Sequence, residues 1–245
     1  AYEILPSIVG SEMCISDRHT IPQDKINKFL VAYAKQGKRV LRLKGGDPFI
    51  FGRGGEEIES LMKNKIAFQV VPGISAANGI SSYAGIPLTH RDHAQSCLFL
   101  TGHFKEGAID FDWPKLIVEK QTLVVYMGLL SLGDLIRNLT IHGMLKEMPI
   151  AVIENGTTAN QKVVVGTLRN IRSKVSRTRI KSPALIIIGT VVGIVGSSIL
   201  SVGATLLIRK NKKKKQAPQE KEEEEEIRDS PVVVQRQENM LLSQW

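Results

Sequence analysis

The stretch RLKGGDPFIFGRGGEE, residues 42–57, contains two Gly-Gly pairs, an Asp-Pro step and two arginines directly after an apolar run. Glycine lacks a Cβ atom, so the backbone at such pairs can approach a ligand closely. Residues 39–43 predict a strand and residues 55–65 a helix. A strand, a glycine-rich turn and a helix are the repeating unit of an α/β fold with a parallel sheet. The polar face of this helix is expected to carry Glu56, Glu57 and Glu59.

The same alternation continues on both sides of this stretch. Residues 21–37 predict a helix and residues 67–71 a second strand, which is followed by the loop PGISAANG, residues 72–79. Ser75 is placed to cap a helix whose free N–H groups face the same sheet edge. Two ligand-accessible loops at one edge predict a cleft. Neither loop has the P-loop or GxGxxG pattern, so nucleoside triphosphates and dinucleotides are not indicated.

The second half of the chain predicts a separate α/β lobe. Short links between its later strands indicate an antiparallel or mixed sheet. We expect an N-terminal lobe over residues 1–93 and a C-terminal lobe over 94–189. The predicted elements of the second lobe are strands at 96–103, 122–128, 148–156, 162–168 and 182–189, and a helix at 129–143.

The chain changes character after Gly189. Residues 190–208 carry no charge and are long enough to form a transmembrane helix. The alternative is that the apolar run is the end of the last strand and packs on the lobe or on a partner subunit. Residues 209–245 begin with a lysine-rich run and continue with five glutamates, so we expect a solvated, disordered tail.

Composition narrows the class of partner. The net charge of +9 over 245 residues suits an anionic partner, but 5% aromatic content and no basic helix make nucleic acid the weakest choice. Cys14 and Cys97 have neither disulfide-framework nor zinc spacing, which favours a reducing compartment. No signal peptide pattern is present, so a cytoplasmic location is expected. His90 and His93 lack further metal ligands nearby, so no metal site is expected.

Six blocks in order carry a resemblance: residues 42–57, the run VVPGISAANGISSYAGIPLTHRD, then FLTGH, VVYMGL, ENGTT with QKVVVGTL, and SPALIIIG. This series resembles the tetrapyrrole methylases, and within them the uroporphyrinogen-III C-methyltransferases. The resemblance implies a two-lobed α/β fold with a parallel sheet in the N-terminal lobe and a mixed sheet in the C-terminal lobe. It also implies a homodimer.

The resemblance further implies methylation of uroporphyrinogen III at C2 and C7 by S-adenosylmethionine, giving precorrin-2 for siroheme or cobalamin biosynthesis, without a metal. By motif position, the cofactor would contact Gly45, Gly46, Asp47, Ile50, Ser75, Ala76, Met127 and Gly156. Tyr126 is expected to be an ordinary core residue. The substrate is a polycarboxylate, which cationic side chains can bind. The candidates are Arg53, Arg91 and His103, with His90 and Lys105 beside them.

The front of the chain departs from the family pattern. The family's GxGxGD loop and its YD element are absent, and Ser11 stands where the family has a proposed acid-base lysine. Catalytic residues are therefore not assigned, and we expect a truncated or diverged chain. The family's first strand lies centrally in its sheet, so its loss would expose unpaired backbone. Two alternatives remain: another precorrin or tetrapyrrole methylase, or a membrane-anchored, non-catalytic S-adenosylmethionine-binding relative.

Overall fold

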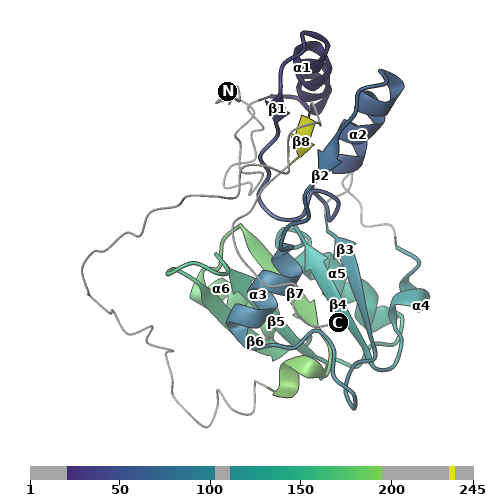
Figure 1. Cartoon of the computed structure of the whole chain (residues 1–245). Helices are drawn as coiled ribbons and strands as arrows, with labels where there is room; N and C mark the ends of the chain where they lie inside the picture. The colour runs from purple at the N-terminus through teal and green to yellow at the C-terminus, as the bar shows by residue number, and fades with distance from the viewer. Residues whose placement is uncertain (1–20, 103–110, 195–231, 235–245) are drawn as a thin grey trace. The chain divides into compact units, whose positions relative to one another are not determined.

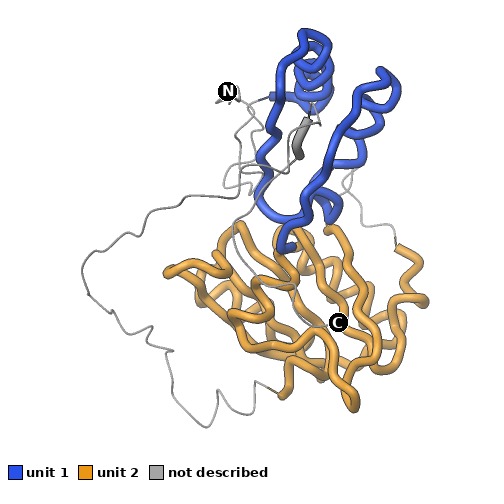
Figure 2. The backbone as a smooth tube through the Cα atoms, viewed as in Figure 1, with its two compact units in different colours: residues 1–75, 209–245 blue, residues 76–208 orange. Residues whose placement is uncertain are grey.

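A computed structural model describes residues 21–102, 111–194 and 232–234 (Figure 1). The chain forms two compact units, unit 1 from residues 1–75 and 209–245 and unit 2 from residues 76–208 (Figure 2). The sequence predicts a boundary near residue 94, whereas in the structure unit 2 begins at Ala76. The reason is that helix α3 (Ala76–Ala84) packs its apolar face on the sheet of unit 2.

Unit 1 has the alternating helices and strands expected from the sequence. The three strands described in this unit form one sheet in the order β1-β8-β2, and β8 pairs in parallel with both neighbours. The expectation of a parallel sheet is confirmed. The elements are α1 (Gln23–Lys35), β1 (Val40–Leu41), α2 (Gly54–Lys63), β2 (Gln69–Val70) and β8 (Val232–Val234).

The central strand of this sheet comes from the segment expected to be disordered. Val233 lies level with Leu41 of β1 and with Gln69 of β2. Three consecutive valines favour an extended backbone. The expected disorder of residues 209–245 therefore does not extend to residues 232–234. The reason is that β1 and β2 both offer backbone N–H and C=O groups to a strand placed between them. β8 thus pairs with the facing backbones of both β1 and β2.

Unit 2 contains a five-stranded mixed sheet in the order β3-β4-β7-β5-β6, as the sequence predicts. Strand β3 is parallel to β4, whereas β7 is antiparallel to both β4 and β5. Strands β3, β4 and β5 therefore all end at the same edge. The elements are β3 (Ser96–Thr101), α4 (Trp113–Leu116), β4 (Gln121–Tyr126), α5 (Leu132–Ile141), β5 (Pro149–Glu154), β6 (Lys162–Thr167), α6 (Ile171–Thr178) and β7 (Ala184–Ile188).

Both faces of the unit 2 sheet are covered, which explains why its strands are almost continuously apolar. On one face, alternate residues of β4, β5 and β7 pack against α4, α5 and α6. On the other face, the intervening residues pack against α3 and against Val191 and Val192. This double covering holds the strand ends rigidly, so the loops that follow them start from fixed points.

The apolar segment 190–208 is described only at its start. Residues 191–194 are helical, and Val191 and Val192 are fully buried in the core shared with α3. The remainder, 195–208, lies outside the described residues. Within the part of the chain that the structure describes, no helix is long and apolar enough to span a membrane.

The position of β8 predicts that the sheet of unit 1 depends on the backbone N–H of Val233. Val233→Pro removes that donor. The loss of one ladder hydrogen bond lowers the stability of the sheet by about 1 kcal/mol, which corresponds to about fivefold faster amide exchange. Hydrogen exchange followed by mass spectrometry should show this acceleration at residues 40–41 and 69–70. The matched control, Val233→Thr, keeps the N–H and should change exchange little. Equal exchange in the proline variant and the parent would contradict the assignment of β8.

Candidate functional site

Two loops of unit 1 meet at the carboxyl ends of β1 and β2, as the sequence predicts. One carboxylate joins them: Asp47 Oδ2 accepts a hydrogen bond from the backbone N–H of Gly73 at 3.1 Å. Asp47 Oδ1 accepts a second one from the N–H of Phe49 at 2.9 Å, which also fixes the turn of the first loop. Asp47 is thus a bridge between the loops through its side chain.

Glycine is required where the two loops touch. A Cβ atom at Gly73 would lie 2.7 Å from the carbonyl oxygen of Gly46, closer than real Cβ atoms come to backbone. Gly46 itself has φ +98°, a conformation that favours glycine. The backbones of Gly46 and Gly73 therefore approach each other closely, whereas the expected approach of this backbone to a ligand stays a prediction. Gly73 was not among the predicted site residues, although it belongs to the PGIS motif.

A buried ion cluster lies at the base of the first loop. Glu57 has an exposed fraction of 0%, and its Oε1 accepts hydrogen bonds from Arg42 Nε at 3.0 Å and Gln23 Nε2 at 3.0 Å. Lys44 Nζ lies 3.2 Å from each carboxylate oxygen. The prediction that Glu57 lies on a polar helix face is wrong, while Glu56 and Glu59 are exposed as expected. The helix turns Glu57 inward together with Leu61, one turn later.

The tip of the first loop exposes apolar and cationic side chains. Phe49, Ile50 and Phe51 are each more than one third exposed. Arg53, at the end of the loop, has a left-handed backbone with φ +57°. Its Nε and Nη2 donate to the two carboxylate oxygens of Glu56, both at 2.8 Å. A substrate carboxylate that bound Arg53 would compete with Glu56 for these donors.

In unit 2, three predicted cofactor contacts gather at one sheet edge. Met127 follows β4, is 50% exposed and has φ +54°, so it is not a core residue. Gly156 follows β5, and a Cβ atom there would collide with Ile80 of α3. Ala76 begins α3, and the N–H of Ala77 donates to the hydroxyl of Tyr126 at 2.8 Å.

Tyr126 is buried as expected of a core residue, but its hydroxyl ties the first turn of α3 to the end of β4. The only sequence signal for this role is a polar group at the end of the apolar run TLVVY. Ser75, which immediately precedes α3, is also buried.

The cationic candidates are placed differently. Arg91 lies in the turn before β3, where Gln95 N–H bonds to the carbonyl of Lys120 ahead of β4. This is the amino-terminal edge of β3 and β4, so Arg91 lies at the opposite sheet edge from Met127 and Gly156. The rings of His90 and His93 pack in the same turn with centroids 4.9 Å apart. The predictions for His103 and Lys105 lie outside the described residues.

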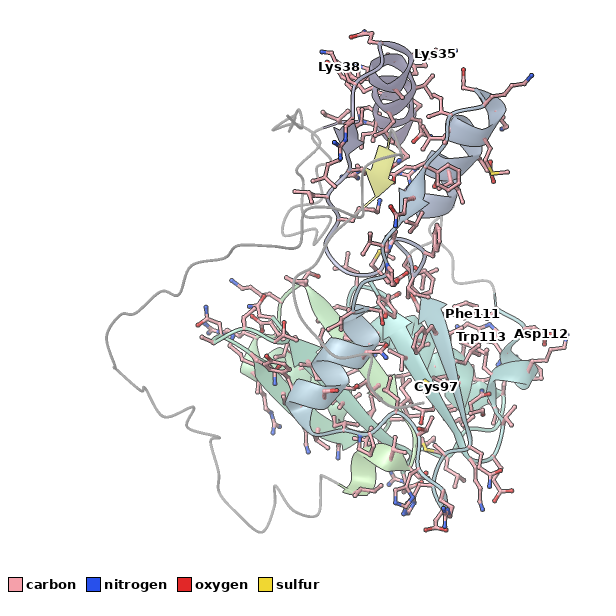
Figure 3. The ribbon with its side chains drawn as sticks, in the orientation of Figure 1. Lys35, Lys38, Cys97, Phe111, Asp112 and Trp113 are labelled. Atoms are coloured by element: carbon pink, nitrogen blue, oxygen red, sulfur yellow. The ribbon has the colours of Figure 1, made fainter. Side chains whose placement is uncertain are left out.

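No other group in the described residues suggests different chemistry. Clusters of three or more histidine, cysteine, aspartate or glutamate side chains that could hold a metal are not found there. Cys97 lies within β3 (Figure 3), and burial raises the pKa of its thiol to about 11. A thiol that is protonated near neutral pH is a poor nucleophile.

Comparison with known proteins identifies the family of the chain. The family model for Tetrapyrrole (Corrin/Porphyrin) Methylases matches residues 3–172. The siroheme synthase of Methylobacillus flagellatus is 61% identical over 176 residues, which cover 72% of this chain and 38% of that protein. The chain thus spans well under half the length of this curated relative.

Solved structures give the same family. Uroporphyrin-III C-methyltransferase from Thermus thermophilus matches with a TM-score of 0.61 and 38% identity, over 72% of this chain and 75% of that one. A structure of the Thermus thermophilus protein complexed with S-adenosyl homocysteine matches with a TM-score of 0.61 and 32% identity, over 70% and 75% of the two chains.

The contact between the loops of unit 1 predicts unequal effects for two glycine substitutions. Gly73→Ala pushes a methyl group against the carbonyl of Gly46. It should lower the free energy of unfolding by about 1–3 kcal/mol, the usual cost of overpacking. Gly55→Ala is the control, because a Cβ at Gly55 meets nothing within 4 Å and alanine favours the α2 helix by up to about 1 kcal/mol. Urea unfolding measures both. If both variants are equally stable, the loops do not touch as described.

Proposed function

The chain belongs to the tetrapyrrole (corrin/porphyrin) methylase family, and on this basis we propose that it transfers the methyl group of S-adenosylmethionine to uroporphyrinogen III. The observation that carries the proposal is the pair of loops joined by Asp47, whose turns contain Gly45, Gly46 and Gly73. Such a pair suits a ligand that must lie against main chain.

The residues of this chain fit a cofactor with an adenosyl group and an amino acid moiety. Backbone N–H groups and carbonyls at the glycine loops can provide polar contacts, and the exposed side chain of Ile50 can provide an apolar one. S-adenosylmethionine supplies a methyl group already activated on a sulfonium sulfur. The protein must therefore mainly align donor and acceptor and exclude water. The proposed cofactor contacts are Gly45, Gly46, Asp47, Ile50, Ser75, Ala76, Met127 and Gly156.

The proposed substrate positions are C2 and C7, with precorrin-2 as product in siroheme or cobalamin biosynthesis. Arg53 is the best-supported carboxylate partner, because it follows the first loop and is partly exposed. Arg91 and His103 stay predictions, and Arg91 would have to act at the other edge of its sheet. The proposal is limited to methyl transfer, since the chain covers 38% of its siroheme synthase relative.

We also propose a homodimer, which the family resemblance implies, and a cytoplasmic location, which agrees with the reducing compartment that the cysteine spacing favours. Light scattering during size-exclusion chromatography tests the first, and fractionation of expressing cells tests the second.

Titration calorimetry with S-adenosylhomocysteine, followed by a methyl transfer assay on uroporphyrinogen III, tests the central proposal. We expect saturable binding at one site per chain and a product two methyl groups heavier than the substrate. Binding without transfer would favour a non-catalytic cofactor-binding relative. Absence of both in folded protein would contradict the proposal.

The role of Arg53 makes a second prediction. Arg53→Gln removes a charge-assisted hydrogen bond to a substrate carboxylate and should raise KM for uroporphyrinogen III about tenfold. The Kd for S-adenosylhomocysteine should stay within about twofold, because the proposed partner of Arg53 is the substrate. Arg137→Gln is the control, since Arg137 also forms an exposed ion pair with an acidic residue three positions away. An unchanged KM would remove Arg53 from the substrate site.

A further inference from the structure

The ion cluster around Glu57 ties together the two ends of the first loop. Lys44 directly precedes the Gly45-Gly46 pair, and Glu57 lies in the first turn of α2, directly after the loop. The Lys44 ammonium contacts both oxygens of the Glu57 carboxylate, so the start and the end of the loop are fixed to each other. The loop is therefore closed at its base by a bond between side chains that water does not reach.

The same carboxylate also fixes the strand and the helix on which the loop stands. Arg42 of the chain leaving β1 donates Nε to Glu57 and Nη1 to the carbonyl of Leu43 at 2.7 Å. Gln23, at the start of α1, donates to Glu57 and to Asn27. A buried carboxylate with several donors has one arrangement that satisfies all of them, so it sets position as well as stability.

The fixed base continues into the contact between loops. Asp47 lies three residues beyond Lys44 and accepts the N–H of Gly73. A shift at Lys44 would therefore move Gly45 and Gly46 and strain the hydrogen bond from Gly73. Within the described residues, a continuous chain of contacts leads from Glu57 through Lys44 to the glycines proposed to hold the cofactor.

We propose that Glu57 is a positioning residue, which holds the first loop in its ligand-ready conformation through Lys44. Glu57 does not touch the ligand, because its side chain is buried beneath the loop. The inference rests on the proposed function for its effect on the cofactor. Its effect on the loop itself does not depend on that function.

The test compares Glu57→Gln with Glu59→Gln in the full chain. Both changes remove one negative charge from the same helix, but Glu59 is exposed and pairs with Lys63 at the surface. Hydrogen exchange of the ligand-free chain should rise about tenfold at residues 45–53 in Glu57→Gln, with β4 amides unchanged as the internal reference. Glu59→Gln should leave the loop as in the parent.

Affinity separates positioning from general stabilisation. At a temperature where both variants are fully folded, the Kd for S-adenosylhomocysteine should weaken about tenfold in Glu57→Gln and stay within about twofold in Glu59→Gln. Lys44→Gln should weaken binding similarly, and the double variant should be no worse than either single one, because the two residues act through one contact. If the parent binds no S-adenosylhomocysteine, the proposed function fails, while loop exchange still tests the role of Glu57.

Two results would overturn the inference: parent-like exchange at residues 45–53 in Glu57→Gln, or a lower melting temperature with unchanged cofactor affinity. If the Glu57→Gln variant does not fold, loop exchange and cofactor affinity in the Lys44→Gln variant alone test the inference. It leaves the bonds from Arg42 and Gln23 to Glu57 in place and removes the bond that fixes the loop.

Discussion

A buried carboxylate that water does not reach depends on hydrogen-bond donors from the protein. In unit 1 this carboxylate is that of Glu57, and its donors must be held close to it. Removing an ion from water is costly, and only partners at close distance offset that cost. Here the donors come from α1 and from the chain between β1 and the first loop. Among the described residues, the apolar core beside it is built around Ile26, Leu30, Val40 and Leu61. The polar contacts of Glu57 add to this core, and they fix the base of the glycine loop.

Unit 2 reaches its arrangement by the opposite route. Its strands are apolar on both faces, and helices cover each face. The polar groups that matter lie at the ends of strands, where Tyr126 holds the first turn of α3. A rigid sheet thus presents Met127 and Gly156 at one edge, which is the side from which parallel-type α/β sheets commonly bind ligands.

Local pattern was enough to predict most helices and strands, because their apolar spacing is regular. It was also enough to predict that the two glycine loops lie together, since parallel strands end at the same edge of a sheet. The burial of Glu57 was not predicted, because three neighbouring glutamates suggest a solvent-exposed helix face. Its spacing of four residues from the buried Leu61 does indicate burial. Arg91 was grouped with the site by motif, while topology places it before β3. β8 could not be foreseen, because its pairing partners are distant in sequence and its flanks are strongly charged.

The central place of β8 has a consequence for the order of events during synthesis. The ribosome releases residues 96–188, which complete the described sheet of unit 2, well before residues 232–234. Pairing over such long separations must first overcome the entropy of closing a large loop. The described helices of unit 1 emerge from the ribosome first. Its sheet is nevertheless expected to form only after β8 has been synthesised, and so to complete its folding after unit 2. Until then the edges of β1 and β2 remain open to chaperones or to the strands of other nascent chains.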